Sequence, residues 1–259
     1  MEFLLWKYVG ALVFGLLVGS FLNVCIYRLS HNMSPAKGRS LCPNCGHLIA
    51  WYDNIPLFSF IFLRGRCRHC SVPISLRYPL VEFLTALLSL ATFCTYPDPL
   101  SYLLYFIFLI APLFVIVFID LDTYTIPDSI TLPGIVCGVL VRVARHPEQW
   151  MHEGMMSFFG IVVSGGMLLL IAWYAVRVRK KEGMGGGDIK LAAMLGAFFG
   201  PHDAVIILLL SACCGLLVSL PLMAMGRLKR DHPIPFGPFI VLAAYLLFFF
   251  HQSLYVLLS

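Results

Sequence analysis

The stretch that decides the fold runs from Leu103 to Asp122 and reads LLYFIFLIAPLFVIVFIDLD. It is a long apolar run that ends in two carboxylates, Asp120 and Asp122. About 20 apolar residues suffice to span a bilayer as a helix, so the run predicts a transmembrane helix. Ionisable groups at membrane depth are costly to bury, and their default interpretation is functional. The stretch therefore predicts a membrane protein with chemistry at one end of a helix.

A second aspartate, Asp188, stands in a comparable place. It ends the sequence GMGGGD, residues 183–188, directly before another apolar run. Two carboxylates beside helix breaks favour a pair that does proton chemistry, because two nearby carboxyl groups share one proton. Glycines such as Gly185 and Gly187 let the backbone leave helical geometry and approach a substrate closely. The alternative for Asp188 is a helix N-cap before Ile189.

The composition of the chain is that of a polytopic membrane protein. Of its 259 residues, 60% are hydrophobic and only 12% are charged, whereas about a quarter of a soluble domain is charged. Long apolar runs favour an all-α membrane protein over a barrel. The net charge of +5 does not indicate nucleic acid, because the basic residues lie between apolar runs. The first run has no small-residue cleavage site after it, so we expect a retained helix and not a signal peptide.

The apolar runs predict eight transmembrane helices. The expected spans are 3–24, 79–95, 100–119, 129–143, 155–176, 189–200, 204–225 and 237–256. The fourth and sixth are short, follow the two aspartates, and contain or end near glycine or proline. Short, broken helices at corresponding places often line a polar cavity, although ordinary short helices of a bundle are the alternative.

The distribution of basic residues predicts the orientation. With the amino terminus outside, four loops face the cytosol, and they hold 15 of the 18 lysines and arginines. The positive-inside rule therefore favours this orientation. Asp120 and Asp188 are then expected on the same, cytosolic side. The four loops are 25–78, 120–128, 177–190 and 226–236.

Four cysteines in the first of these loops predict a metal site. Cys42-Pro-Asn-Cys45 and Cys67-Arg-His-Cys70 are two Cys-x-x-Cys knuckles separated by 21 residues, a spacing close to that of zinc ribbons. A cytosolic loop disfavours disulfides. We expect structural Zn²⁺ bound by the four thiolates, with a redox-active thiol cluster as the alternative. A closed four-sulfur site has no open position, so it is expected to organise the loop and not to catalyse.

The order of short motifs along nearly the whole chain resembles one family. Its motifs are GSFLNV (19–24), YRL (27–29), the two cysteine knuckles with WYDNIP (51–56) between them, LRGRCR (63–68), ISLRYP (74–79), IDLD (119–122), PD (127–128), GGGD (185–188) and PIPFGP (233–238). A lone Gly-x-Gly-Asp would be weak, but the ordered set is specific. The chain resembles the bifunctional type IV prepilin peptidases, which are membrane aspartic proteases that also methylate their product.

The resemblance implies an activity, a place and partners. Enzymes of this family cut the leader of prepilins and pseudopilins after a glycine in the bacterial inner membrane. They then N-methylate the new amino terminus with S-adenosylmethionine, and the products build type IV pili or type II secretion pseudopili. The catalytic aspartates of the family correspond here to Asp120 and Asp188. The implied domains are an amino-terminal part (1–98), which contains the cysteine loop (26–78) and is associated with methylation, and a peptidase domain (99–259).

Two further aspartates compete for roles near the site. Asp122 lies two residues from Asp120, and on a helix the two side chains point about 200° apart, so both cannot face Asp188. The resemblance favours Asp120. Asp128 follows Pro127 and is expected to be the N-cap of the fourth span, although the family motif includes this residue and a supporting role stays open.

The methyl-transfer half rests on the resemblance alone. No glycine-rich dinucleotide-type loop marks the S-adenosylmethionine site, and its residues are not assigned. Asn23 and Glu82 are candidates, but a plain ion pair of Glu82 with Arg28 or Arg77 is favoured. The segment from Pro233 to Pro238 either borders the substrate groove or gives a rigid entry to the last helix.

Two other classes of protein use similar features. A proton- or metal-coupled transporter also carries intramembrane aspartates and broken helices, but it does not explain the cysteine loop. A membrane scaffold that docks a partner through this loop would tolerate loss of Asp120 and Asp188.

Overall fold

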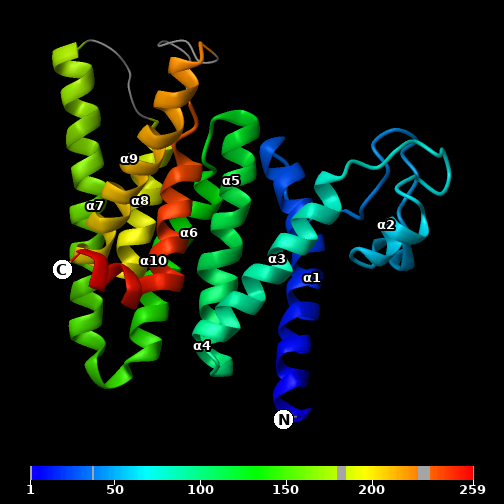
Figure 1. Cartoon of the computed structure of the whole chain (residues 1–259), viewed down its shortest axis with the longest axis horizontal. Coiled ribbons are helices and arrows are strands. Elements are labelled where there is room, and N and C mark those ends of the chain that lie inside the picture. The colour runs from blue at the N-terminus through cyan, green and yellow to red at the C-terminus, as the bar shows by residue number, and fades with distance from the viewer. Residues whose placement is uncertain (1, 37, 180–184, 227–233, 259) are drawn as a thin grey trace. The chain divides into compact units, whose positions relative to one another are not determined.

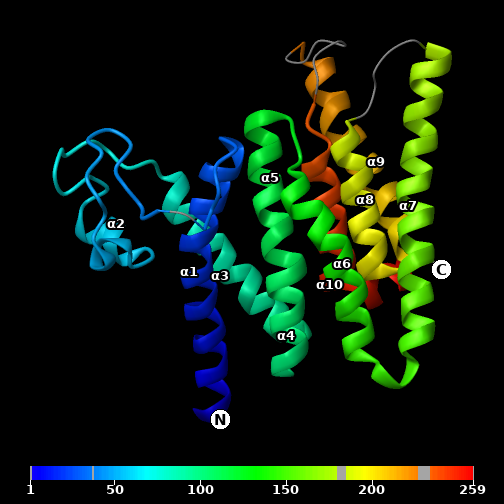
Figure 2. The same cartoon turned by 180° about the vertical axis from the view of Figure 1, so that it is seen from behind.

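The computed structural model describes residues 2–36, 38–179, 185–226 and 234–258. Helices dominate these residues, which contain no strand and only two isolated β-bridges, so the expected all-α membrane fold is confirmed. The chain divides into two compact units, residues 1–106 and 107–259. Figures 1 and 2 show the helices from opposite sides.

The amino-terminal unit is built on the close packing of α1 (Glu2–Ser30) against α3 (Arg77–Thr95). Gly15 and Gly19 lie one helical turn apart, and a Cβ on either would collide with α3 backbone at 2.7–2.8 Å. Small residues at this spacing let two membrane helices approach closely. The buried Ser89 hydroxyl adds a hydrogen bond of 2.7 Å to the Ala11 carbonyl of α1. A loop with η1 (Trp51–Asn54) and α2 (Phe58–Phe62) joins the two helices.

The carboxyl-terminal unit is a bundle of six helices among the described residues. A continuous helical segment, Pro99–Thr123, leads into it and consists of α4 (Pro99–Tyr105), a π turn (Phe106–Ile110) and α5 (Ala111–Thr123). The Tyr245 hydroxyl donates a hydrogen bond of 2.8 Å to the Ile110 carbonyl, which ties the last helix to this turn. The other helices are α6 (Asp128–Arg145), α7 (Trp150–Arg179), α8 (Gly186–Phe199), α9 (Pro201–Ala224) and α10 (Gly237–Leu258), with η3 (Pro147–Gln149) before α7.

Helices α7 and α8 touch backbone to backbone at one point. A Cβ on Gly160 would collide with the Gly196 carbonyl, and a Cβ on Gly196 with the Gly160 carbonyl. Beside this crossing, Ser164 donates to the Ala192 carbonyl at 2.8 Å and Ser157 to the Ala197 carbonyl at 2.9 Å. Small residues and interhelical hydrogen bonds drive helix association in a bilayer, where the hydrophobic effect is weak. This crossing fixes α8, the short helix that begins near Asp188.

The crossing gives a stability prediction. Gly160→Ala is expected to lower the unfolding free energy by about 2–3 kcal/mol, because rigid backbone and not a flexible side chain occupies the space. Thermal unfolding of the purified protein in detergent measures this. Gly154→Ala, on the same helix but with nothing within 4 Å of the added Cβ, is the matched control. Equal melting temperatures for the two variants would contradict the close crossing.

Each of the eight expected spans coincides closely with a long helical segment. Five segments have the length and hydropathy of a membrane crossing: Leu5–Ser30, Arg77–Thr95, Pro99–Thr123, Pro147–Val178 and Pro201–Ala224. Helices α6 and α8 do not reach those limits, and the apolar part of α10 is short, Gly237–His251. Eight crossings therefore stay a prediction. The first helix also continues to Ser30, further than the expected end at residue 24.

Candidate functional site

Asp120 is a buried carboxyl group near the C-terminal end of α5. Only 4% of the residue is exposed. Its Oδ2 accepts a hydrogen bond of 3.0 Å from the backbone N–H of Gly237, the first residue of α10. The first N–H groups of a helix have no partner within the helix, and the N-terminus carries partial positive charge. The start of α10 therefore holds and polarises this carboxyl.

Asp188 lies in the first turn of α8, at the same end of the bundle. Figures 1 and 2 both show the C-terminal end of α5 and the N-terminal end of α8 at one end of the carboxyl-terminal unit. The side chain is half-buried, accepts a hydrogen bond from the Gly185 N–H, and interacts electrostatically with Asp120. The N-cap of α8 is Gly185, so the N-cap interpretation of Asp188 is wrong.

One isoleucine packs against two glycines at the starts of α8 and α10, next to the carboxyl groups. A Cβ on Gly187 would lie 2.8 Å from the Ile126 Cβ, and a Cβ on Gly237 would lie 3.3 Å from the Ile126 Cδ1. Ile126 is buried in the short connection between α5 and α6. It thus packs against the starts of both α8 and α10. The neighbouring Gly183 and Met184 of the glycine-rich motif lie outside the described residues.

Sequence reasoning offered the segment from Pro233 to Pro238 as a border of the substrate groove but did not connect Gly237 with Asp120, and it missed Ile126. The available signal for Gly237 was its place between Phe236 and Pro238, which predicts a helix start with a free N–H group. That signal identifies the donor but not its acceptor 117 residues away. Ile126 carried no signal, because a lone apolar residue in a short loop has many possible contacts.

Asp122 and Asp128 lie differently from Asp120. Asp122 is exposed on α5, in line with its expected position away from the buried face. Asp128 is the first residue of α6 and follows Pro127 as N-cap, so the expectation that Asp128 itself caps the helix is wrong. Its carboxylate instead forms an ion pair with Lys190 of α8, with both oxygens 2.7 Å from Nζ. This pair joins the starts of α6 and α8.

A substitution at Gly237 tests whether the start of α10 positions the Asp120 carboxyl. A Cβ on Gly237 would come within 2.6 Å of the Asp120 Oδ2. A flexible side chain end yields more easily than backbone, so Gly237→Ala is expected to fold but to displace the carboxyl. A displacement of about 1 Å costs about 100-fold in a reaction rate. The activity assay proposed below measures this, with Gly215→Ala as control, since its Cβ would meet only ordinary contacts at 3.8 Å. Equal activity of the two variants would contradict the arrangement.

The four predicted cysteine ligands come together in the loop after α1. The Sγ atoms of Cys42, Cys45, Cys67 and Cys70 all lie within 4.8 Å of one another. Those of Cys42 and Cys70 are 3.8 Å apart, which is about the separation that two sulfurs bound to one zinc have when each Zn–S bond is about 2.3 Å. The cluster therefore fits a tetrahedral metal ion.

The two halves of the cluster have the same local structure. In each, an antiparallel bridge closes the turn, Leu41 with Leu48 and Arg66 with Pro73. The first cysteine of each knuckle accepts a backbone hydrogen bond from the residue four positions on, Gly46 or Ser71, and both of these residues have positive φ. The repeat explains why the two Cys-x-x-Cys motifs fold alike. The rings of His47 and His69 lie against each other beside the sulfurs, with centroids 3.4 Å apart.

The pKa values of two of the thiols are lowered by hydrogen bonds, whereas that of a third is raised. Backbone N–H groups of Cys45 and Asn44 lower the pKa of Cys42. The backbone N–H of Val72 and the Asn44 side chain lower the pKa of Cys70 to about 6. At Cys45 a hydrogen bond from the His47 backbone lowers the pKa. Desolvation and the neighbouring thiols outweigh this effect and raise the pKa to about 11. All four thiols ionise together only around a metal ion, because its positive charge offsets the repulsion among four thiolates.

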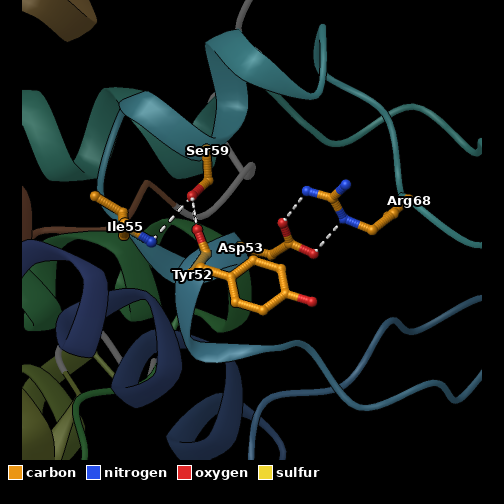
Figure 3. Close-up of polar contacts among 5 residues, drawn as sticks. All are labelled: Tyr52, Asp53, Ile55, Ser59 and Arg68. Atoms are coloured by element: carbon orange, nitrogen blue, oxygen red, sulfur yellow. Dashed lines mark hydrogen bonds and ion pairs between the residues drawn. The ribbon is translucent and has the colours of Figure 1, made fainter.

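A polar cluster braces the second knuckle against the segment between the knuckles (Figure 3). The Arg68 guanidinium binds both Asp53 oxygens, at 2.8 and 2.6 Å, and lowers the pKa of that carboxyl. Arg68 also lies over the Tyr52 ring, 5.6 Å from its centroid. The Ser59 hydroxyl accepts from the Ile55 N–H and donates to the Tyr52 carbonyl. The cysteine loop is thus a small folded module.

Glu82 and Asn23 take part in the contacts of the amino-terminal unit. Glu82 accepts hydrogen bonds from the Leu57 N–H, at 2.9 Å, and from the Ser20 hydroxyl. Glu82 was expected to form an ion pair with an arginine, but among the described residues it accepts hydrogen bonds from these two donors. Arg28 donates to carbonyls of the loop. Asn23 donates to the Tyr78 carbonyl at 3.1 Å. Both polar side chains therefore join the loop and α3 to α1.

Comparison with known proteins relates both units to one family. The family model described as the bacterial peptidase A24 N-terminal domain matches residues 13–96, and the type IV leader peptidase family matches residues 107–220. No solved structure matches the chain significantly.

Several relatives carry the name prepilin leader peptidase/N-methyltransferase. The protein of Aeromonas hydrophila is 37% identical over 96% of this chain and 93% of its own length. That of Burkholderia pseudomallei is 35% identical over 96% and 87%. That of Myxococcus xanthus is 42% identical over 83% of this chain and 63% of its own length. These matches show that the chain belongs to the prepilin leader peptidase/N-methyltransferase family of membrane aspartic proteases.

Proposed function

We propose that this protein removes the leader peptide of type IV prepilins and pseudopilins after a glycine, and then N-methylates the new amino terminus. The observation that supports the proposal is the placement of Asp120 near the C-terminal end of α5 and Asp188 in the first turn of α8. They come from helices far apart in sequence, lie at one end of the same unit, and interact electrostatically. The aspartic protease family that the chain belongs to supports the same conclusion.

The proposed hydrolysis uses the two carboxyl groups in complementary roles. Two adjacent carboxyls share one proton, so one acts as base and the other as acid. The ionised group takes a proton from a water molecule, whose oxygen attacks the scissile carbonyl. The protonated group donates its proton to the departing nitrogen when the C–N bond breaks. The Gly237 N–H then stabilises negative charge on Asp120, because it donates to that carboxyl.

The surroundings of the carboxyls suit an extended substrate. A peptide in a helix has its carbonyls hydrogen-bonded within the chain, so the scissile segment must be unwound before water attacks it. Gly185, Gly186 and Gly187 present no side chain beside Asp188. This bare backbone allows close approach of an extended peptide. Gly185 and Gly187 are supporting residues of the site on this proposal, and Asp128 supports it by holding Lys190 at the start of α8.

Methyl transfer is assigned to the amino-terminal part, residues 1–98, and cleavage to residues 99–259. S-adenosylmethionine would supply the methyl group: its S–CH3 bond breaks as the N–C bond to the new amino terminus forms, and the amino group loses a proton. Zn²⁺ bound by Cys42, Cys45, Cys67 and Cys70 would hold the two knuckles together and would leave no open position for catalysis.

The proposed setting is the bacterial inner membrane, with the amino terminus outside. The loops that carry most lysines and arginines then face the cytosol, as the positive-inside rule requires. The ends of α5 and α8 that carry Asp120 and Asp188 lie on that side. A prepilin leader, which enters from the cytosol, would reach both carboxyls there.

The test is an assay of the purified protein in detergent with a prepilin substrate. Mass spectrometry is expected to show loss of the leader at a glycine and, only when S-adenosylmethionine is added, the gain of one methyl group. Cleavage without methyl gain would limit the proposal to the peptidase half. An intact substrate would contradict it and would favour a transporter or scaffold.

A further inference from the structure

The short helix α2 presents an apolar face that the chain leaves uncovered. Phe58, Ile61 and Phe62 are 68%, 71% and 88% exposed. Their spacing of three and four residues places them on one side of the helix. The opposite side faces the module, where Phe60 packs against Gly65 at a distance that leaves little room for a Cβ. The apolar side is therefore turned away from the cysteine module.

A hydrogen bond next to α2 ties it to the charged end of the α1–α3 pair, inside the first basic residues. The N–H of Leu57, the residue before α2, bonds to Glu82 of α3, and the Glu82 backbone packs against Gly19 of α1. Arg28, the first charge towards the C-terminal end of α1, lies nine positions after Gly19, or about 13.5 Å along the helix at a rise of 1.5 Å per residue. Figure 1 accordingly shows α2 beside α1 and not beyond its C-terminal end. Water is not the expected surrounding at this level.

The residues after α2 fit the edge of a bilayer. Arg64 and Arg66 are exposed and follow the helix directly. Long basic side chains extend along apolar surface to reach the headgroup layer, where anionic phosphates bind them. An apolar helix face beside basic residues, with aromatic side chains, is the pattern of a segment that lies in the membrane interface. Trp51 and Tyr52, which are also exposed, are the residue types enriched at that boundary.

We propose that α2 is an interfacial membrane helix that inserts Phe58, Ile61 and Phe62 among the acyl chains of anionic phospholipids, in the leaflet around the C-terminal half of α1. The cysteine module is then held against the membrane at a third place besides α1 and α3. This assignment does not depend on the peptidase activity or on a bound metal.

Fluorescence quenching in a bilayer tests the proposal. The full-length variants Phe62→Trp and Ala36→Trp are reconstituted into nanodiscs of phosphatidylethanolamine and phosphatidylglycerol, with and without brominated acyl chains. Ala36 is the control because it is exposed in the loop beyond the end of α1. The signal of the native tryptophans is subtracted by measuring the unsubstituted protein in the same nanodiscs.

The two sites are expected to respond in opposite ways. Brominated lipid is expected to remove about half or more of the fluorescence added by Phe62→Trp and little of that added by Ala36→Trp, because an interfacial helix lies about 5–10 Å deep. Aqueous acrylamide is expected to quench the control only. Quenching of Phe62→Trp by acrylamide alone would place α2 in water, and protection from both quenchers would place it under protein; either result overturns the proposal. Ile61→Trp replaces Phe62→Trp if that variant fails to fold.

Discussion

Replacement of Asp120 or Asp188 by asparagine is expected to abolish leader cleavage, with a rate loss of about 10³-fold or more. Asparagine keeps the size of the side chain but can neither accept a proton from water nor donate one to the leaving nitrogen. Because the two carboxyls act as one unit, the double variant should be no slower than the slower single variant. Mass spectrometry of prepilin after timed incubation measures these rates.

Asp122→Asn is the matched control for this experiment. It removes a carboxyl two residues from Asp120 on the same helix, but from an exposed position. Its cleavage rate should stay close to that of the unsubstituted protein. If Asp122→Asn is inactive while Asp120→Asn cleaves, the catalytic role belongs to Asp122 and the buried position of Asp120 has another purpose. Cleavage by both Asp120→Asn and Asp188→Asn would refute the aspartic mechanism.

Replacement of Cys42 or Cys70 by serine is expected to release the metal and stop methylation. Each substitution removes one of four thiolates, and zinc affinity should fall by about 100-fold or more because metal binding and folding of such a loop are coupled. The two knuckles would also lose the connection that a shared metal ion gives them. The zinc content of purified protein and methyl gain on a pre-cleaved substrate are the two measurements.

The leader-cleavage activity of the serine variants distinguishes the roles of the two units of the protein. The serine variants should still remove the leader, because Asp120 and Asp188 belong to the other compact unit. Cys94→Ser is the control, since this exposed cysteine of α3 is outside the cluster. A protein that contains no zinc yet methylates fully would contradict the structural-metal proposal. Equal loss of both activities in Cys42→Ser would contradict the division of labour.

The apolar patterning of the chain was sufficient to predict the fold class and the helices. A bilayer forces backbone groups to be satisfied within each segment, so a long apolar run has essentially one solution. The same logic predicted the cysteine cluster, because four soft ligands in two knuckles have few other arrangements that satisfy them. The ends of helices were predicted less well, as α1 and the start of α6 show, because capping depends on local contacts.

The sequence by itself thus determined an all-helical membrane protein, two aspartates near helix ends and a four-cysteine module. Only the tertiary structure decided what surrounds them: that Gly237 donates to Asp120, that Ile126 packs against the starts of α8 and α10, and that Lys190 pairs with Asp128. It also placed Leu57, the residue before α2, against Glu82 of α3. The physical reason is that periodicity and ligand type are local properties, whereas a hydrogen-bond acceptor 117 residues away is chosen by how the helices pack.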